Sequence, residues 1–122
     1  MPNVTVVFYC DEEGEAPFLE WFDELPDKAQ DKCLAKLERL AEMGHELRRP
    51  EADYLKDDIY ELRFEYLSVN YRVLYYFHGR QLIVLSHGFK KQQSKVPEKE
   101  ISIAVSRRQK FIKNPERHTY EE

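Results

Sequence analysis

The sequence predicts an α+β fold, chiefly from the order of its elements. One strand-like segment comes first, two helical segments follow, and three closely spaced strand-like segments precede a final helix. The short connections between the last three strands favour an antiparallel meander. We therefore expect one domain over residues 1–122, with a small, mostly antiparallel sheet and helices packed on one of its faces.

The first half of the chain supplies the first strand and two helices. Residues 3–10, NVTVVFYC, are rich in β-branched and aromatic side chains, which predicts a strand. Pro17 suits a first helical turn, and residues 18–25 then place four apolar side chains toward a core. Residues 26–45 repeat small and apolar residues at helical spacing, and Gly44 suits the end of that helix.

The second half supplies three strands and the last helix. We interpret residues 48–58 as a loop, because Pro50 disfavours continued regular structure. The three strand-like segments that follow are 58–66, 70–78 and 81–89. The last of these is apolar at both parities, which is typical of a central strand. The final helix begins at Pro97 and carries a buried apolar stripe.

The composition is that of a globular protein, with 42% apolar and 34% charged residues. No apolar run approaches the roughly 20 residues that a membrane-spanning helix needs. The N-terminus lacks the pattern of a secretory signal, so we expect a cytoplasmic protein with no membrane partner. The two cysteines and four histidines are too scattered to predict a metal site.

The net charge of −4 conceals an uneven distribution along the chain. Residues 1–58 contain 7 lysines and arginines against 16 acidic residues, whereas residues 59–113 contain 11 against 4. A basic half within an acidic chain indicates a local face that binds anions. The alternative is a charge scattered over a solvated surface, and the positions of the basic residues decide between the two.

Four basic residues occupy related positions in the predicted sheet. Arg63 lies on the strand face opposite a set of aromatic and leucine side chains, and Arg72 lies opposite a similar set on the next strand. Lys90 and Lys91 follow at the end of the third strand. We expect the four to converge on the sheet face that the helices leave open, as a phosphate-binding site.

Each of these residues also has a structural interpretation. In this interpretation, Arg63 pairs with Glu61 or Glu65, and Arg72 is a lone exposed arginine of a strand. The two lysines protect an edge strand against pairing between molecules. Singly, none of the four indicates a site, and it is their joint placement that favours one.

Two further side chains have open roles. An exposed Tyr76 would stack on a nucleobase, although aromatic residues in such strands more often belong to a core. His87 is either a proton donor or a buried histidine. Its shared parity with Ile83 and Leu85 favours the buried position.

Three segments of the chain carry a family resemblance: LKDDIYELRFEY, NYRVLYYFHGRQLIVLSHGFKKQQSKVP and EISIAVSRRQKF. They resemble the RelE/ParE toxin superfamily, and within it the HigB-like, phage-derived branch that inhibits host growth. The resemblance covers about residues 55–112 in order and spacing. The first half of the chain is similar to the family only in its order of strand, helix and helix.

The resemblance implies a RelE-like fold and a toxin of a type II toxin–antitoxin system. Such toxins cleave mRNA, commonly on the ribosome, without a metal or an organic cofactor, and a small helix-turn-helix antitoxin holds them inactive. ParE-like relatives inhibit DNA gyrase instead. The alternatives are therefore a gyrase inhibitor without nuclease activity, or an inactive partner-binding domain derived from a mobile element.

The resemblance also implies roles for the basic residues. In metal-free cleavage the ribose 2′-oxygen attacks the adjacent phosphate, and cations stabilise the charge that develops there. The candidate catalytic residues are Arg63, Arg72, Lys90 and Lys91. The candidate bases or acids are Glu61, Glu51, Asp53 and His87, and the candidate RNA-binding residues are Lys95, Arg107 and Tyr76.

Overall fold

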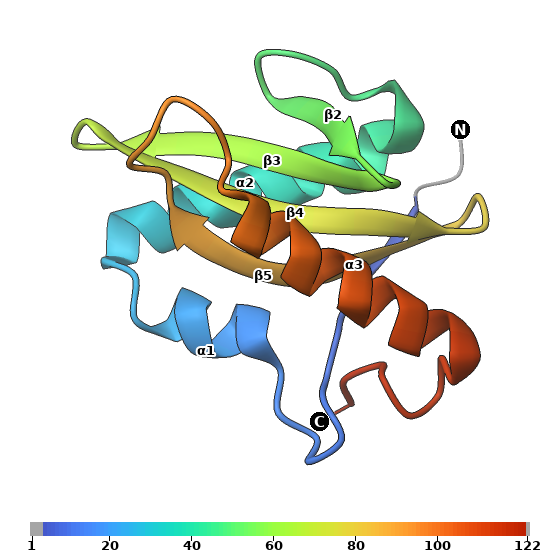
Figure 1. Cartoon of the computed structure of the whole chain (residues 1–122). Helices are drawn as coiled ribbons and strands as arrows, with labels where there is room; N and C mark the ends of the chain where they lie inside the picture. The colour runs from blue at the N-terminus through green and yellow to red at the C-terminus, as the bar shows by residue number, and fades with distance from the viewer. Residues whose placement is uncertain (1–3, 122) are drawn as a thin grey trace.

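A twisted five-stranded sheet forms the centre of the molecule in a computed structural model that describes residues 4–121 (Figure 1). The strands are β1 (Thr5–Phe8), β2 (Ala52–Lys56), β3 (Ile59–Tyr66), β4 (Val69–His78) and β5 (Leu82–Lys90). The helices are α1 (Pro17–Asp23), α2 (Asp27–Met43) and α3 (Glu98–Lys113), with a single 3-10 turn η1 (Gly44–Glu46) after α2. The predicted α+β class is confirmed.

The sheet has the order β1-β5-β4-β3-β2, in which only β1 with β5 is a parallel pair in the described chain. The last four strands form the antiparallel meander, because each connection is a tight turn. Asp57 and Asp58, and then Leu67 and Ser68, adopt the left-handed conformation that two-residue hairpin turns require. Gly79 does the same in the turn between β4 and β5.

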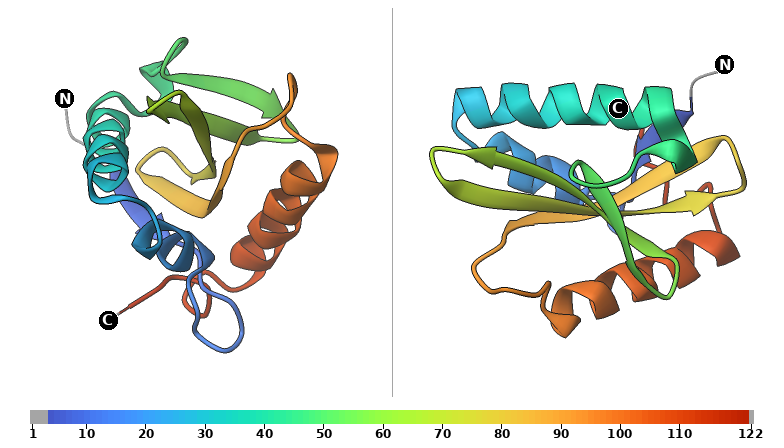
Figure 2. Two further views of the ribbon diagram at one scale, coloured as in Figure 1. Left: turned by 90° about the vertical axis from the view of Figure 1, so that its left-hand side faces the viewer. Right: turned by 90° about the horizontal axis from the view of Figure 1, so that it is seen from above.

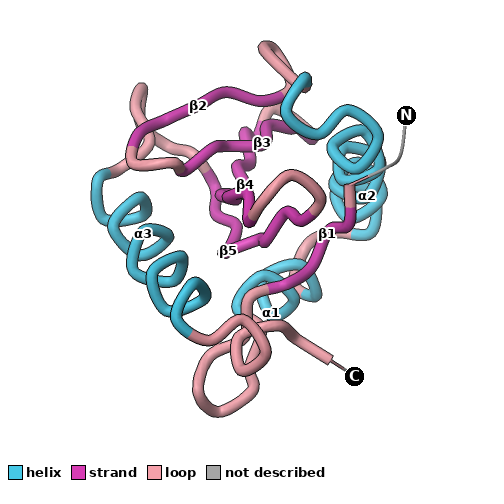
Figure 3. Tube along the Cα trace, turned by 90° about the vertical axis from the view of Figure 1, so that its right-hand side faces the viewer, coloured by secondary structure: helices cyan, strands magenta, loops and turns pink. Residues whose placement is uncertain are grey.

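Helices cover both faces of this sheet, which corrects the expectation that they pack on one face only. α1 and α2 pack on one face, against residues such as Leu62, Val73 and Leu85. α3 packs on the other face, where Leu74 and others meet its side chains (Figures 2 and 3). β5 is apolar at both parities along most of its length because both of its faces are buried.

Strand β2 corrects a second expectation, since residues 48–58 were interpreted as a loop. Ala52–Lys56 pairs with β3 and forms the edge of the sheet. From Asp53 to Lys56 the segment alternates between half-buried and exposed side chains, with Tyr54 and Lys56 exposed, as an edge strand should. Pro50 only delays the start of the strand.

A bulge in β5 changes which side chains share a face. Leu74 pairs with His87, but its neighbour Tyr75 pairs with Leu85, so the parity of β5 shifts there. His87 therefore lies on the α3 face and not with Leu85 as expected. Beyond the bulge, Phe89 lies on the α3 face and Lys90 on the opposite one, because paired residues share a face.

None of the helices in the described part of the chain combines the length and the apolar character that crossing a membrane requires.

Candidate functional site

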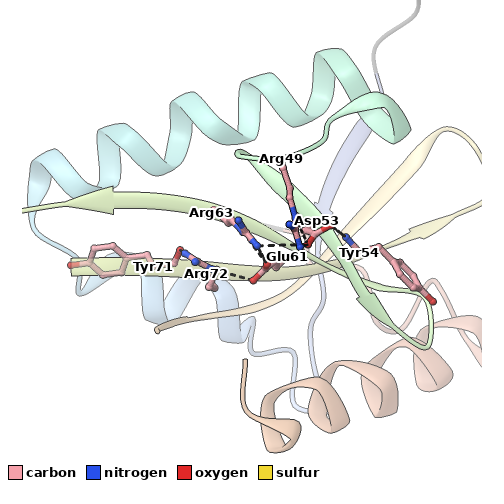
Figure 4. A network of polar contacts seen from close by, with 7 residues as sticks. All are labelled: Arg49, Asp53, Tyr54, Glu61, Arg63, Tyr71 and Arg72. Carbon is pink, nitrogen blue, oxygen red and sulfur yellow. Dashed lines mark hydrogen bonds and ion pairs between the residues drawn. The ribbon is translucent and has the colours of Figure 1, made fainter. Parts of the chain in front are cut away.

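A buried carboxylate joins the two arginines that the sequence singled out (Figure 4). One oxygen of Glu61 accepts hydrogen bonds from Arg63, with Nη2 at 2.7 Å and Nε at 2.9 Å. The other oxygen accepts a bond of 3.0 Å from Nε of Arg72. Glu61 is only 2% exposed and Arg72 only 8%, so the pairing is largely shielded from water.

The register of the sheet creates this arrangement. Arg63 and Arg72 lie directly opposite each other on β3 and β4, and Glu61 lies two residues from Arg63 on the same face. Two cations placed in this way repel each other unless an anion lies between them. Burial lowers the pKa of Arg72, an effect that Arg63 increases and that Glu61 opposes.

The charged network continues onto β2. Arg49 binds Asp53 through two contacts, 2.9 Å from Nε and 2.8 Å from Nη2 to the same carboxylate oxygen. That oxygen also lies 3.7 Å from Nη2 of Arg63. Figure 4 shows the resulting row from Arg49 to Arg72, in which cations and carboxylates alternate.

Arg63 lies where two clefts meet. A cleft of about 320 Å³ runs beneath the loop 91–97 and contains Arg63, Lys91 and Lys95 among its lining residues. A groove of about 560 Å³ lies beside α2 and is lined by Arg63 and Arg72. At 29% side-chain exposure, Arg63 is the member of the buried network that remains accessible from both.

The three candidate carboxylate bases are all held by cations. Arg39 and Lys36 of α2 bind Glu51 at 2.8 and 3.2 Å, and this pairing lowers the pKa of Glu51 to about 2. Arg49 lowers the pKa of Asp53 in the same way. Glu61 is buried with both oxygens occupied. None of the three presents an unpaired carboxylate to the clefts.

The two lysines after β5 have different surroundings. Lys91 is half-buried and lines the cleft together with Arg63 and Lys95. Lys90 is exposed and, by its pairing with Tyr71, belongs to the opposite face of the sheet. The expected convergence of all four basic residues is therefore wrong for Lys90.

His87 is buried under α3 and not available as a surface acid. Its Nδ1 lies 2.8 Å from Oγ of Ser86, and its Nε2 lies 2.9 Å from a carboxylate oxygen of Glu100 on α3. This order of serine, histidine and carboxylate resembles a nucleophilic triad, but Ser86 is fully buried. The contacts instead tie α3 to the sheet.

Arg107 and Tyr76 also belong to the packing of α3. Nη1 of Arg107 lies 3.3 Å from both the carbonyl and the hydroxyl oxygen of Ser86, and its guanidinium lies 5.6 Å from the centre of the Tyr9 ring. Tyr76 is 1% exposed and packs edge-on against Phe111. The expectation of an exposed, base-stacking Tyr76 is wrong, because α3 covers its face of the sheet.

Sequence reasoning missed the contribution of β2 to the cleft. Arg49, Tyr54 and Lys56 line it opposite Lys91 and Lys95, and Tyr54 is 49% exposed. The apolar pair Tyr54 and Leu55 between two charged residues was a weak signal for this strand. Among the described residues, no group of three or more histidine, cysteine or acidic side chains is arranged to hold a metal ion.

Comparison with known proteins agrees with the resemblance seen in the sequence. The family model described as "Phage derived protein Gp49-like" matches residues 20–109. Two relatives from Mycobacterium tuberculosis, strains CDC 1551 / Oshkosh and ATCC 25618 / H37Rv, are both named "Probable endoribonuclease HigB1". Each is 29% identical over 100 residues, which cover 82% of this chain and 78% of the relative. The match extends over α2, which the sequence related to the family only by element order.

Removal of the Glu61 carboxylate tests the energetic role of the network. We expect Glu61→Ala to lower the free energy of unfolding by about 3–5 kcal/mol, because it leaves Arg72 buried without its anion. Asp53→Ala removes a carboxylate whose main partner, Arg49, is exposed, and should cost less than about 1 kcal/mol. Urea unfolding measures both. Equal losses in the free energy of unfolding would contradict the distinction between the buried pair Glu61–Arg72 and the exposed pair Asp53–Arg49.

The buried His87 predicts a pH dependence of stability. Burial lowers the pKa of His87, against the opposing effect of its bond to Glu100. The unfolded chain then binds the proton more readily, so the free energy of unfolding should decrease as the pH falls below about 6.5. Unfolding at pH 7.5 and 5.5 should show a smaller decrease for His87→Gln than for the wild type. A decrease in His87→Gln as large as that of the wild type would refute this role.

Proposed function

Because the chain belongs to the Gp49-like family of phage-derived proteins, we propose that it is the toxin of a type II toxin–antitoxin system and acts as an endoribonuclease. The name of the two mycobacterial relatives, a probable endoribonuclease, supports the activity. The RelE/ParE-like segments of the second half support the toxin assignment.

The position of Arg63 is the observation that carries this proposal. Arg63 is held by a buried carboxylate, which fixes its orientation, and it borders both clefts. Lys91 and Lys95 add positive charge along the cleft beneath the loop 91–97. An RNA strand in this cleft would meet an ordered guanidinium with flexible ammonium groups beside it, which suits a phosphate backbone.

The reaction is the transfer of a phosphoryl group within the RNA. The 2′-oxygen forms a bond to the adjacent phosphorus while the bond to the 5′-oxygen of the next nucleotide breaks. The products are a 2′,3′-cyclic phosphate and a free 5′-hydroxyl, and the proton lost by the 2′-hydroxyl is balanced by the one that the leaving oxygen gains. Arg63 stabilises the charge on the phosphoryl oxygens, and Lys91 stabilises the leaving oxygen.

The remaining candidates take supporting roles in this proposal. Arg72 is buried and shares Glu61 with Arg63, so we assign it to the positioning of that pair. Lys90 lies on the opposite face and is left outside the reacting centre. The proposal assigns proton transfer to none of Glu51, Asp53 and Glu61, since cations hold all three.

The cellular setting follows from the same family resemblance. We propose that the domain acts in the cytoplasm on mRNA bound to the ribosome, where the message is presented as a single strand. We also propose a small helix-turn-helix protein as its antitoxin. A short reading frame for such a protein beside the gene would support this partner.

Removal of the Arg63 guanidinium tests the proposed activity. We expect Arg63→Ala to lower the rate of mRNA cleavage in a translating extract by about 10²–10³-fold, the usual effect of removing one stabiliser of developing charge. Arg80→Ala is the matched control, because Arg80 is exposed in the turn between β4 and β5 and lines neither cleft. Primer extension measures the cleavage. Intact mRNA with the wild-type protein, together with growth arrest and inhibited gyrase, would contradict the proposal.

A further inference from the structure

Strand β2 covers only part of the outer edge of β3. The last pair between the two strands is Ala52 with Leu62, and the last backbone bond runs from the N–H of Arg63 to the carbonyl of Glu51 at 2.8 Å. β3 continues beyond this point to Tyr66. The sheet therefore has a short stretch of edge beyond β2, next to the tip of the β3–β4 hairpin (Figure 1).

The backbone of Glu65 points out of this edge. The carbonyl of Asn70, which pairs with Glu65, accepts a bond from the N–H of Lys91, so Asn70 directs its backbone groups toward β5. Its pair with Glu65 is then one without mutual hydrogen bonds. The N–H of Arg63, two residues away, points to the β2 side in the same way. Glu65 thus offers an N–H and a C=O beyond the end of β2.

A positively charged groove borders this free edge. It has a volume of about 560 Å³, and its lining includes Lys32 and Lys36 of α2 on one side and Arg63 and Arg72 on the other. Glu51 and Glu65 also border it, and of these two carboxylates Glu51 is paired with Lys36 and Arg39. Lys32 is exposed and has no ion-pair partner among the described residues. Four basic residues against two acidic ones leave the lining of the groove with an excess of positive charge.

The free edge favours a peptide over RNA as the occupant. A backbone N–H and C=O that point the same way match the backbone of an added strand. The side chains of such a strand would alternate between the lysines of α2 and the two arginines. Leu67, 77% exposed at the rim, adds an apolar contact. We propose that this groove binds an extended, acidic segment of a partner protein as an additional strand beside β3.

Binding of this segment would cover Arg63 and Arg72, because both line the groove. Acidic side chains would then pair with Arg63, the cation of this groove that the proposed reaction uses. Such a partner would exclude RNA by competition for charge, with no change in the fold. This exclusion rests on the proposed ribonuclease function, whereas the docking of the segment does not.

Amide hydrogen exchange of the isotopically labelled full chain tests the docking. The probe is a synthetic peptide of about ten residues in which pairs of aspartates alternate with pairs of valines, so that both faces of an added strand carry aspartate, and its length spans one strand. We expect it to slow exchange at the Glu65 amide. A peptide with lysine in place of aspartate should bind at least about tenfold more weakly, because it lacks the negative charge. A backbone N-methylated peptide should bind more weakly by a similar factor, because it lacks the N–H groups that pair with the strand edge.

Charge reversal at the groove supplies the control. Lys32→Glu should weaken binding of the aspartate peptide about five- to tenfold, whereas Lys113→Glu, an equal change at an exposed position on α3, should leave it unchanged. Unprotected Glu65 at saturating peptide, or equal effects of the two reversals, would overturn the docking. If single-stranded RNA binds, if Lys32→Glu weakens that binding, and if the Glu65 amide stays unprotected, the groove binds RNA and the docking proposal is also overturned. Absence of RNA cleavage by the wild-type protein would refute the proposed function. Peptide affinity and exchange at the Glu65 amide would still test the docking.

Discussion

The contact of Glu61 with Arg63 and Arg72 is the interaction on which the site depends. The register of β3 and β4 places two guanidinium groups opposite each other, and the carboxylate between them compensates the charge that burial would otherwise isolate. The three side chains come from the middle of adjacent strands, so the rigid sheet fixes their positions. A guanidinium held in this way has a fixed orientation before any ligand binds, and the proposed function relies on this condition for electrostatic stabilisation.

The two-sided packing of the sheet determines where this network is accessible. α3 covers Leu74 and Tyr76, and its contact with His87 through Glu100 fixes its first turns. Before the first turn of α3, the loop 91–97 borders the cleft in which Arg63 is accessible. On the outer side the short β2 ends, so Arg63 also reaches the groove beside α2. Arg63 is therefore accessible from both clefts, as the two proposals require.

Much of the fold could be predicted from the sequence, because hydrophobic period and turn spacing are local signals. The segments 58–66, 70–78 and 81–89 match β3, β4 and β5 within two residues at each end. The bulge between Leu85 and His87 was not predictable, since it depends on pairing with β4, and it moved Lys90 away from the arginines. The alternative in which Arg63 pairs with Glu61 is confirmed, but sequence spacing could not show that the same carboxylate also binds Arg72.

Steady-state cleavage by Glu61→Gln tests the central claim most directly. This change keeps the size of the side chain and removes the charge that orients Arg63, while Arg63 itself remains. The account predicts a kcat at least about tenfold lower with KM unchanged or lower, because the loss falls on the transition state and a negative charge near the RNA has been removed. Circular dichroism must first show that the variant is folded under the assay conditions. A folded variant with the kcat of the wild type would contradict the claim that Glu61 positions Arg63 for catalysis.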